Sequence, residues 1–267
     1  GCNLLEGYGL SEASPVVTAN PLDLKSFDGS IGIPFPSTEV GILGEQGQWL
    51  PADEVGEICI SNPGVYEGST YTEADKNKEL FADGRFLRTG DLGRIDADGY
   101  LFITGRAKDL IIRGGHNIDP AIIEEALMGH EAVGFVGAIG QPDAHAGELP
   151  CAYVELVKGK SASVDDLMAY AANHIHERAA LPKHLEILPE LPKTAVGKVF
   201  KPDLRRLAIT RTFDAALAEA GVPARVASVV EDKKRGLVAQ LQKSAPVEDS
   251  AVSAVLGQFA NPWEWAA

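Results

Sequence analysis

Cysteine is scarce in this sequence. Its 267 residues contain only three, Cys2, Cys59 and Cys151, an odd number with no Cys-x-x-Cys spacing. A disulfide-stapled secreted protein or a four-cysteine zinc site needs more thiols at closer spacing. We therefore expect a chain of the reducing cytoplasm, with neither a disulfide framework nor a zinc cage.

Long apolar runs and excess positive charge are missing as well. No window approaches the roughly 18 consecutive apolar residues of a membrane-spanning helix. Lys and Arg number 24 against 38 Asp and Glu, which gives a net charge of −14. Such a field repels nucleic-acid phosphates and anionic lipid. We expect no nucleic-acid partner and no transmembrane segment, and an anionic ligand must be held by local donors or a metal.

The chain opens Gly1-Cys2-Asn3, with no initiator methionine and no signal-peptide pattern. This start is typical of a boundary inside a longer protein. At about 150 residues per domain, the length corresponds to about two domains. The apolar fraction of 45% and charged fraction of 23% are those of a globular chain.

Residues 1–106 are rich in glycine and short apolar runs, which predicts a mostly β region. Expected strands are Glu39 to Leu43, Gly56 to Ser61, Phe86 to Ile95 and Tyr100 to Thr104. The turn residues Asp96-Ala97-Asp98-Gly99 predict a hairpin between the last two strands.

Residues 107–208 alternate between helical and strand patterns, which predicts an α+β domain. Asp119 followed by Pro120 marks the start of a helix over about 120–129. Further strands are expected at 132–139, 151–157 and 185–188, and a helix at 164–178. Residues 209–267 are expected to form an appended α/β extension, with helices at 212–220 and 249–259 and strands at 224–230 and 236–241.

Two motifs in residues 1–106 combine glycine with chemistry-bearing side chains. In Gly7-Tyr8-Gly9-Leu10-Ser11-Glu12, the glycines allow close approach to a flat ligand, and Ser11 and Glu12 offer a hydroxyl for phosphate and a carboxylate for Mg²⁺. The alternative is an ordinary glycine turn after a strand. In Arg88-Thr89-Gly90-Asp91, the aspartate can accept ribose hydroxyls. The alternative there is a β-bulge with a solvated carboxylate.

Two further motifs lie beyond the composition change. The segment 105–117 contains Arg106 and Lys108, where a hinge is expected, and then Gly114-Gly115, whose backbone few other residues adopt. The segment 192–201 places Lys198 beside a glycine, where a lysine can reach an anion. A charged linker and a solvated loop are the plain alternatives.

Taken together and in order, these motifs resemble one family. The strings are GYGLSE (7–12), GSIGIP (29–34), RTGDLG (88–93), GRAKDLIIRGGHNIDPAIIEE (105–125) and PKTAVGKVFK (192–201). They resemble the AMP-forming acyl-CoA synthetases and other adenylate-forming enzymes over about residues 1–208. The resemblance implies the β-rich end of a large N-terminal domain, incomplete here (1–106), then a mobile C-terminal domain (107–208).

The resemblance also implies roles for residues that match the family's motifs. Tyr8, with Gly7 and Gly9, would lie along the adenine, Ser11 would contact phosphate and Glu12 would hold Mg²⁺. Asp91 would bind the ribose with help from Arg106, and Lys198 would act at the carboxylate and α-phosphate during adenylation. Lys108 would be the hinge about which the C-terminal domain turns, bringing Gly114 and Gly115 toward the coenzyme A channel. His116 stands where relatives often carry Glu.

The implied reaction is ATP-dependent activation of a carboxylic acid, fatty or aryl in style, to an acyl-adenylate, followed by thioester formation with coenzyme A. The family's phosphate-wrapping loop and most of its acyl pocket are not found in the sequence. We therefore expect the C-terminal half of a magnesium-dependent acyl-CoA ligase whose N-terminal part completes the site. Two alternatives stay open: an adenylation enzyme that loads a phosphopantetheine carrier protein, and a truncated, non-catalytic binding module.

Overall fold

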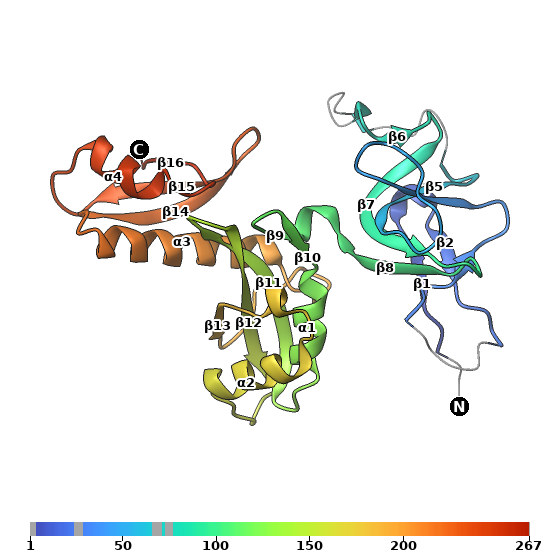
Figure 1. The fold of residues 1–267 in the computed structure, drawn as a ribbon, viewed down its shortest axis with the longest axis horizontal. Helices are drawn as coiled ribbons and strands as arrows, with labels where there is room; N and C mark the ends of the chain where they lie inside the picture. Colours follow the sequence, from blue (N-terminus) through green and yellow to red (C-terminus); the bar gives the residue numbers. More distant parts are fainter. Residues whose placement is uncertain (1–3, 24–28, 66–70, 73–76, 267) are drawn as a thin grey trace. The chain divides into compact units, whose positions relative to one another are not determined.

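The computed structural model describes residues 4–23, 29–65, 71–72 and 77–266 (Figure 1). Cys2 and the chain start lie outside these residues. The chain divides into two compact units, Gly1–Lys108 and Asp109–Ala267. Its strands and helices together form a mixed α/β fold, as expected.

The unit Gly1–Lys108 is built from two antiparallel sheets. One has the order β1-β2-β3 and the other the order β4-β5-β7-β6, with β8 also paired to β7. The strands are β1 (Gly7–Gly9), β2 (Val16–Ala19), β3 (Ile33–Pro34), β4 (Glu39–Leu43), β5 (Gly56–Ser61), β6 (Phe81–Ala82), β7 (Phe86–Ile95) and β8 (Leu101–Arg106). A short 3₁₀ turn at Ser11–Ala13 follows β1, and another at Ala107–Asp109 follows β8 and leads into the second unit.

The hydrophobic core of this unit forms where alternate residues of the strands face inward. Ile58 and Ile60 of β5 and Leu101 of β8 are fully buried, and they pack with Val17 of β2 and Leu87 of β7. The expected hairpin between β7 and β8 is confirmed, with Asp96 N donating to Tyr100 O at 3.0 Å. Core packing therefore fixes the β7–β8 ladder that carries the candidate residues Asp91 and Arg106.

The unit Asp109–Ala267 contains two further sheets. The first has the order β10-β9-β12-β11, with β13 parallel to β12, and the second has the order β14-β15-β16. The elements are β9 (Ile111–Arg113), β10 (His116–Ile118), α1 (Pro120–Met128), β11 (Val133–Asp143), β12 (Gly147–Leu156), α2 (Val164–His174), a 3₁₀ turn (Arg178–Ala180), β13 (His184–Ile187), α3 (Lys201–Glu219), β14 (Ala224–Asp232), β15 (Gly236–Lys243), α4 (Asp249–Leu256) and β16 (Trp263–Trp265).

Local chemistry explains the starts of α1 and α2. The Asp119 side chain accepts a hydrogen bond from Ala121 N and Pro120 opens the helix, as the sequence predicts. A reciprocal pair of hydrogen bonds between Ser163 and Asp166 opens α2. The prediction that this helix continues to residue 178 is wrong, because Ile175 is extended and buried and Arg178–Ala180 is a separate turn.

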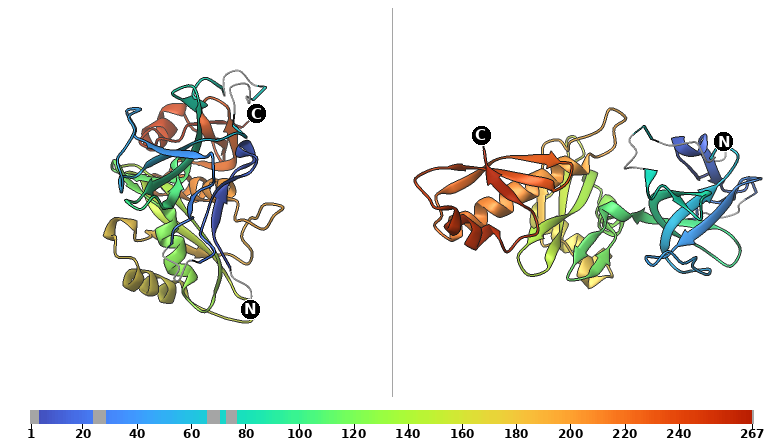
Figure 2. Two further views of the ribbon diagram at one scale, coloured as in Figure 1. Left: turned by 90° about the vertical axis from the view of Figure 1, so that its right-hand side faces the viewer. Right: turned by 90° about the horizontal axis from the view of Figure 1, so that it is seen from above.

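Helix α3 runs without a break from the first sheet to the second (Figures 1 and 2). Leu204 and Ala208 pack with Ile139 and Tyr153 of the first sheet. Phe213 and Leu217 pack against the second sheet and α4. The predicted start at Thr212 is therefore wrong, and residue 208 lies inside the helix. The division into 1–106, 107–208 and 209–267 stays a prediction, with α3 shared by its last two parts.

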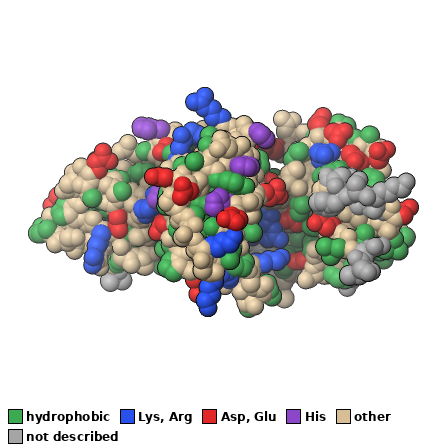
Figure 3. Space-filling model, turned by 90° about the horizontal axis from the view of Figure 1, so that it is seen from below, with side chains coloured by type: hydrophobic (Ala, Val, Ile, Leu, Met, Phe, Trp, Pro, Cys, Tyr) green, Lys and Arg blue, Asp and Glu red, His purple; other side chains and the backbone are tan. Residues whose placement is uncertain are grey.

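The surface carries the mixture of charged and apolar side chains that the composition leads us to expect. On the face shown in Figure 3, acidic and basic side chains are interspersed with hydrophobic and other groups. Within the described part of the chain, no helix combines the length and apolar character needed to cross a membrane. Cys59 and Cys151 are buried and free of disulfides.

Candidate functional site

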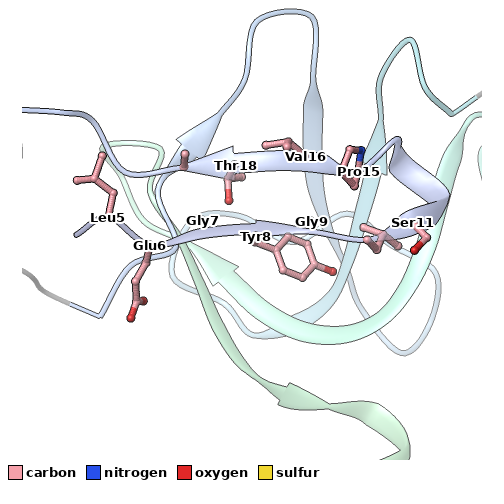
Figure 4. Close-up of a pocket in the computed structure, with 11 residues that line it drawn as sticks. Leu5, Glu6, Gly7, Tyr8, Gly9, Ser11, Pro15, Val16 and Thr18 are labelled. Carbon is pink, nitrogen blue, oxygen red and sulfur yellow. The ribbon is translucent and has the colours of Figure 1, made fainter. Parts of the chain in front are cut away.

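The β1–β2 hairpin forms one wall of a pocket of about 550 Å³. Tyr8 on β1 lies opposite Thr18 on β2, so both side chains project to one side of the hairpin (Figure 4). Gly7, Gly9 and Ser11 line the same pocket. The structure thus gathers the GYGLSE motif around one concave surface.

The two glycines beside Tyr8 are needed for strand packing. A Cβ on Gly7 would lie 2.8 Å from Thr18 O, and one on Gly9 would overlap Pro15 O. The pairing of β1 with β2 also shifts register between Tyr8 and Gly9. These glycines thus permit the close approach of the neighbouring strand. The close approach to a flat ligand expected from the sequence stays a prediction.

Tyr8, Asp91 and Arg106 form a hydrogen-bonded group. The Tyr8 hydroxyl donates to Asp91 Oδ2 at 2.6 Å, and Arg106 Nε donates to Asp91 Oδ1 at 2.9 Å. Asp91 and Arg106 are cross-strand partners on β7 and β8. Burial and the hydrogen bond to Asp91 raise the pKa of the Tyr8 hydroxyl well above its usual range, so it stays a neutral donor.

A bulge in β7 directs Asp91 into this group. The pairing of β5 with β7 shifts register around Thr89–Asp91, and Gly90 has a φ of 73°, a left-handed conformation that suits glycine. Thr89 Oγ1 donates to Ile58 O and accepts from Asp91 N. The bulge expected as the plain alternative is present, but its aspartate is not a solvated carboxylate, since Asp91 is only 6% exposed. A ribose-binding role for Asp91 stays a prediction.

A second pocket, of about 370 Å³, adjoins the first, since Leu10 lines both. Glu12, Asp91, Arg106 and Lys108 line it, together with Thr89, Gly90 and Ala107. The Glu12 carboxylate accepts a hydrogen bond from the Tyr71 hydroxyl at 3.1 Å. Every candidate residue of the unit Gly1–Lys108 therefore lies on one of two neighbouring pockets.

The remaining candidates, Lys198, Gly114 and Gly115, belong to the unit Asp109–Ala267. Lys198 is exposed on a hairpin in which Thr194 N donates to Lys198 O at 2.7 Å. Gly114 and Gly115 form the turn between β9 and β10, with φ angles of 59° and 83°. Two successive left-handed residues explain why both positions are glycine. Lys108 is the last residue of the first unit, directly before the junction with Asp109.

The sequence did not reveal the roles of several residues around the pockets. Thr89 belongs to a quoted motif, but its role as a link between Asp91 and β5 depends on the bulge. Glu57 accepts from Arg88 and from Gly90 N, which supports the bulge from β5. Tyr71 reaches Glu12 across 59 residues of sequence, a separation that no local pattern reveals.

The arrangement suits a neutral-to-anionic ligand that carries hydroxyl groups. A carboxylate has about four acceptor positions, so Asp91 keeps acceptor capacity beside its bonds to Tyr8 and Arg106. Arg106 is 59% exposed and can also face an anion. Among the described residues, no cluster of three or more His, Cys, Asp or Glu side chains could hold a metal ion. The single carboxylate of Glu12 fits Mg²⁺ only in the mode where phosphates and water complete the shell.

Comparison with known proteins identifies the family of this chain. The AMP-binding enzyme model matches residues 1–69, and the model of the AMP-binding enzyme C-terminal domain matches residues 122–198. The chain therefore belongs to the AMP-binding enzymes, and it resembles the C-terminal half of adenylate-forming enzymes.

Individual relatives agree with this assignment. The chain is 43% identical over 216 residues to the marinolic acid–CoA ligase of Pseudoalteromonas sp., covering 79% of this chain and 33% of that protein. It is 43% identical over 202 residues to a long-chain-fatty-acid–CoA ligase of Bacillus subtilis, covering 75% and 36%. A solved structure of o-succinylbenzoate coenzyme A synthetase from Bacillus subtilis, in complex with ATP and magnesium ion, is 32% identical with a TM-score of 0.68, covering 75% and 41%. The chain thus spans about a third of the length of the curated relatives it matches.

Proposed function

We propose that this chain forms the C-terminal part of an AMP-forming acyl-CoA ligase. In the first half-reaction, a carboxylic acid and MgATP give an acyl-adenylate and pyrophosphate. In the second, the thiol of coenzyme A displaces AMP and forms the thioester. The observation that carries the proposal is the group of Tyr8, Asp91 and Arg106, assembled from separate motifs in a chain of this family.

The adenine nucleotide is assigned to the two pockets of the unit Gly1–Lys108. The Tyr8 ring supplies a flat surface for the base, the Asp91 carboxylate accepts hydrogen bonds from the ribose hydroxyls, and the Arg106 guanidinium donates to the ribose or the neighbouring phosphate. Ser11 lies on the first pocket as a hydroxyl donor to phosphate. Glu12 serves as a carboxylate ligand of Mg²⁺, which would offset phosphate charge when bound.

Lys198 is assigned to the first half-reaction only. Its ammonium would stabilise negative charge as the carboxylate attacks the α-phosphate. Gly114 and Gly115 are assigned to the second half-reaction, beside the path of the coenzyme A thiol. We propose that rotation at Lys108 exchanges these two groups between the half-reactions.

The names of the relatives support a proposal for the class of acid and for the acceptor. The named relatives activate marinolic, long-chain fatty and o-succinylbenzoic acids, which supports a fatty or aryl acid here and a role in fatty-acid metabolism. All three names specify coenzyme A as acceptor. Comparison of coenzyme A with a phosphopantetheine carrier protein as acceptor, using a panel of acids, distinguishes the ligase from a carrier-loading enzyme. A cytoplasmic location stays a prediction from the cysteine content.

The test of the proposal is carboxylate-dependent exchange of labelled pyrophosphate into ATP by the full-length protein that contains this chain. Lys198→Ala should slow the exchange by about 100-fold or more, because a positioned charge at the transition state is lost. The control Lys158→Ala removes an exposed lysine from a turn of the same unit and should leave the rate unchanged. Exchange at the wild-type rate in Lys198→Ala would remove Lys198 from this role.

A further inference from the structure

The hairpin 193–199, here called the lysine hairpin, is closed by its own backbone. Lys193 and Val199 form a bridge at its base, and Gly197 N donates to Thr194 O at 2.9 Å across its tip. Gly197 has a φ of 80°, which allows the tight turn just before Lys198. The hairpin is therefore closed by its own hydrogen bonds, and the position of Lys198 depends on how its base is held.

The first arm of the lysine hairpin is held by β12 and β11. Glu155 of β12 accepts hydrogen bonds from Lys193 Nζ at 2.6 Å and from Leu191 N at 2.7 Å. The Lys193 ammonium also lies 4.2 Å from the centre of the Phe135 ring on β11. Burial alone would raise the pKa of Glu155, but these hydrogen bonds lower it below its usual range. The carboxylate thus stays ionised and bonded to the first arm.

The second arm rests on Gly137 of β11. A Cβ on Gly137 would lie 2.9 Å from Val199 Cγ1 and closer still to Leu204 Cδ1, whereas unstrained carbon atoms stay about 3.5–4.0 Å apart. Leu204 is fully buried among the residues that it contacts, and Val199 is β-branched with few rotamers. A methyl group at residue 137 would therefore press against a fully buried side chain, that of Leu204, and against the half-buried side chain of Val199.

Glycine within a strand is otherwise unfavourable, since it leaves nothing to pack and costs backbone entropy. Gly137 lies in the middle of the β11–β12 ladder, paired with Tyr153, and its φ is not in the left-handed region. The backbone conformation at residue 137 therefore does not require glycine. The close approach of the Val199 and Leu204 side chains does require it.

We propose that Gly137 is a positioning residue for Lys198. Because residue 137 has no side chain, Val199 and the start of α3 can pack directly against β11, and this packing fixes the base of the lysine hairpin. The inference rests on the proposed function, in which Lys198 acts during adenylation. A methyl group at residue 137 moves the hairpin base outward, and a displacement of about 1 Å of a reacting group can lower a rate by about 100-fold.

Gly137→Ala in the full-length protein tests the proposal through the two half-reactions. Pyrophosphate exchange should fall about 10- to 100-fold, while thioester formation from supplied acyl-adenylate should be unchanged because Lys198 takes no part in it. Gly134→Ala is the matched control on the same strand, where a Cβ would meet its neighbours at ordinary distances of 3.4 Å or more. Equal loss of both half-reactions, or full exchange activity, would overturn the proposal.

A second variant covers the case in which Gly137→Ala does not fold. Val199→Ala removes the contact from the other side at a half-buried position, and it should slow exchange but not thioester formation. Val196→Ala, at the 80% exposed tip of the same hairpin, is its control and should change neither reaction. If Lys198→Ala is inactive while Val199→Ala is normal, the positioning role fails and the proposed function stands. If Lys198→Ala is itself normal, the proposed function fails.

Discussion

In the unit Gly1–Lys108 the candidate side chains are bonded to one another, whereas in the unit Asp109–Ala267 they lie at the tips of turns. Asp91 is 6% exposed and carries hydrogen bonds from Tyr8 and Arg106. Lys198, Gly114 and Gly115 are exposed, and their turns depend on glycines with positive φ. This difference agrees with the proposed division of labour, in which a pre-formed nucleotide site serves both half-reactions and separate groups each serve one.

The largest effect expected within this comparison comes from Asp91→Ala. The variant removes the acceptor for the ribose and leaves Tyr8 and Arg106 without their common partner, so AMP affinity should fall about 100-fold, from the loss of hydrogen bonds to a charged group. Titration calorimetry with AMP measures this. Asp98→Ala, at the exposed tip of the β7–β8 hairpin, is the control. Equal affinity in the two variants would show that the buried group is structural only.

Gly115→Ala tests whether the β9–β10 turn serves one half-reaction. An alanine at a φ of 83° costs about 1–2 kcal/mol or shifts the turn, so thioester formation should slow about tenfold while pyrophosphate exchange is unchanged. Gly159→Ala imposes similar strain at a φ of 85° in another turn of the same unit. A matching loss with Gly159→Ala would mean that stability, not the position of the turn, sets the rate.

Tyr8→Phe keeps the ring and removes the hydroxyl, and with it the hydrogen bond to Asp91. AMP affinity should drop about five- to tenfold, as expected for one bond to a carboxylate. Pyrophosphate exchange and thioester formation should both become slower. Tyr100→Phe in the same unit is the control. An unchanged affinity for AMP would mean that Arg106 and the bulge alone orient Asp91, without help from Tyr8.

The smallest expected effect concerns the buried core of the unit Asp109–Ala267, in contrast to its exposed turns. Burial raises the pKa of the Cys151 thiol to about 11, above its ordinary value near 9. Above pH 9 the unfolded chain loses this proton first, so the thiol's contribution to stability is full below pH 9 and declines as the pH rises toward 11. The free energy of unfolding should fall by about 1 kcal/mol more between pH 8 and 10 in wild type than in Cys151→Ala, as urea titrations can measure. Equal pH dependence in both proteins would contradict the burial of a neutral thiol.

Local patterns predicted much of the fold. The bounds predicted for β4, β5 and β7 agree with the structure, because each strand alternates clearly and ends at turn residues. The start of α3 was missed because its two halves bury different faces in different cores, so its apolar residues form no single stripe. The short strands β1, β2 and β3 were missed as well, since two to four residues give little pattern.

The candidate residues were found by motif, but their arrangement was not. Tyr8 and Asp91 are 83 residues apart in sequence and 2.6 Å apart in space. The β7 bulge that aims Asp91 and the packing of Val199 on Gly137 are likewise products of tertiary contact. Residue type indicates the chemistry, whereas the distances that make it work depend on strands brought together by the core.

The division of labour between the units is tested most directly by measuring both half-reactions in Lys198→Ala and Gly115→Ala of the full-length protein. We predict that Lys198→Ala loses pyrophosphate exchange and keeps thioester formation from supplied acyl-adenylate, whereas Gly115→Ala keeps exchange and loses thioester formation. If each variant slows both half-reactions to the same extent, the two groups do not serve separate steps and the account is wrong.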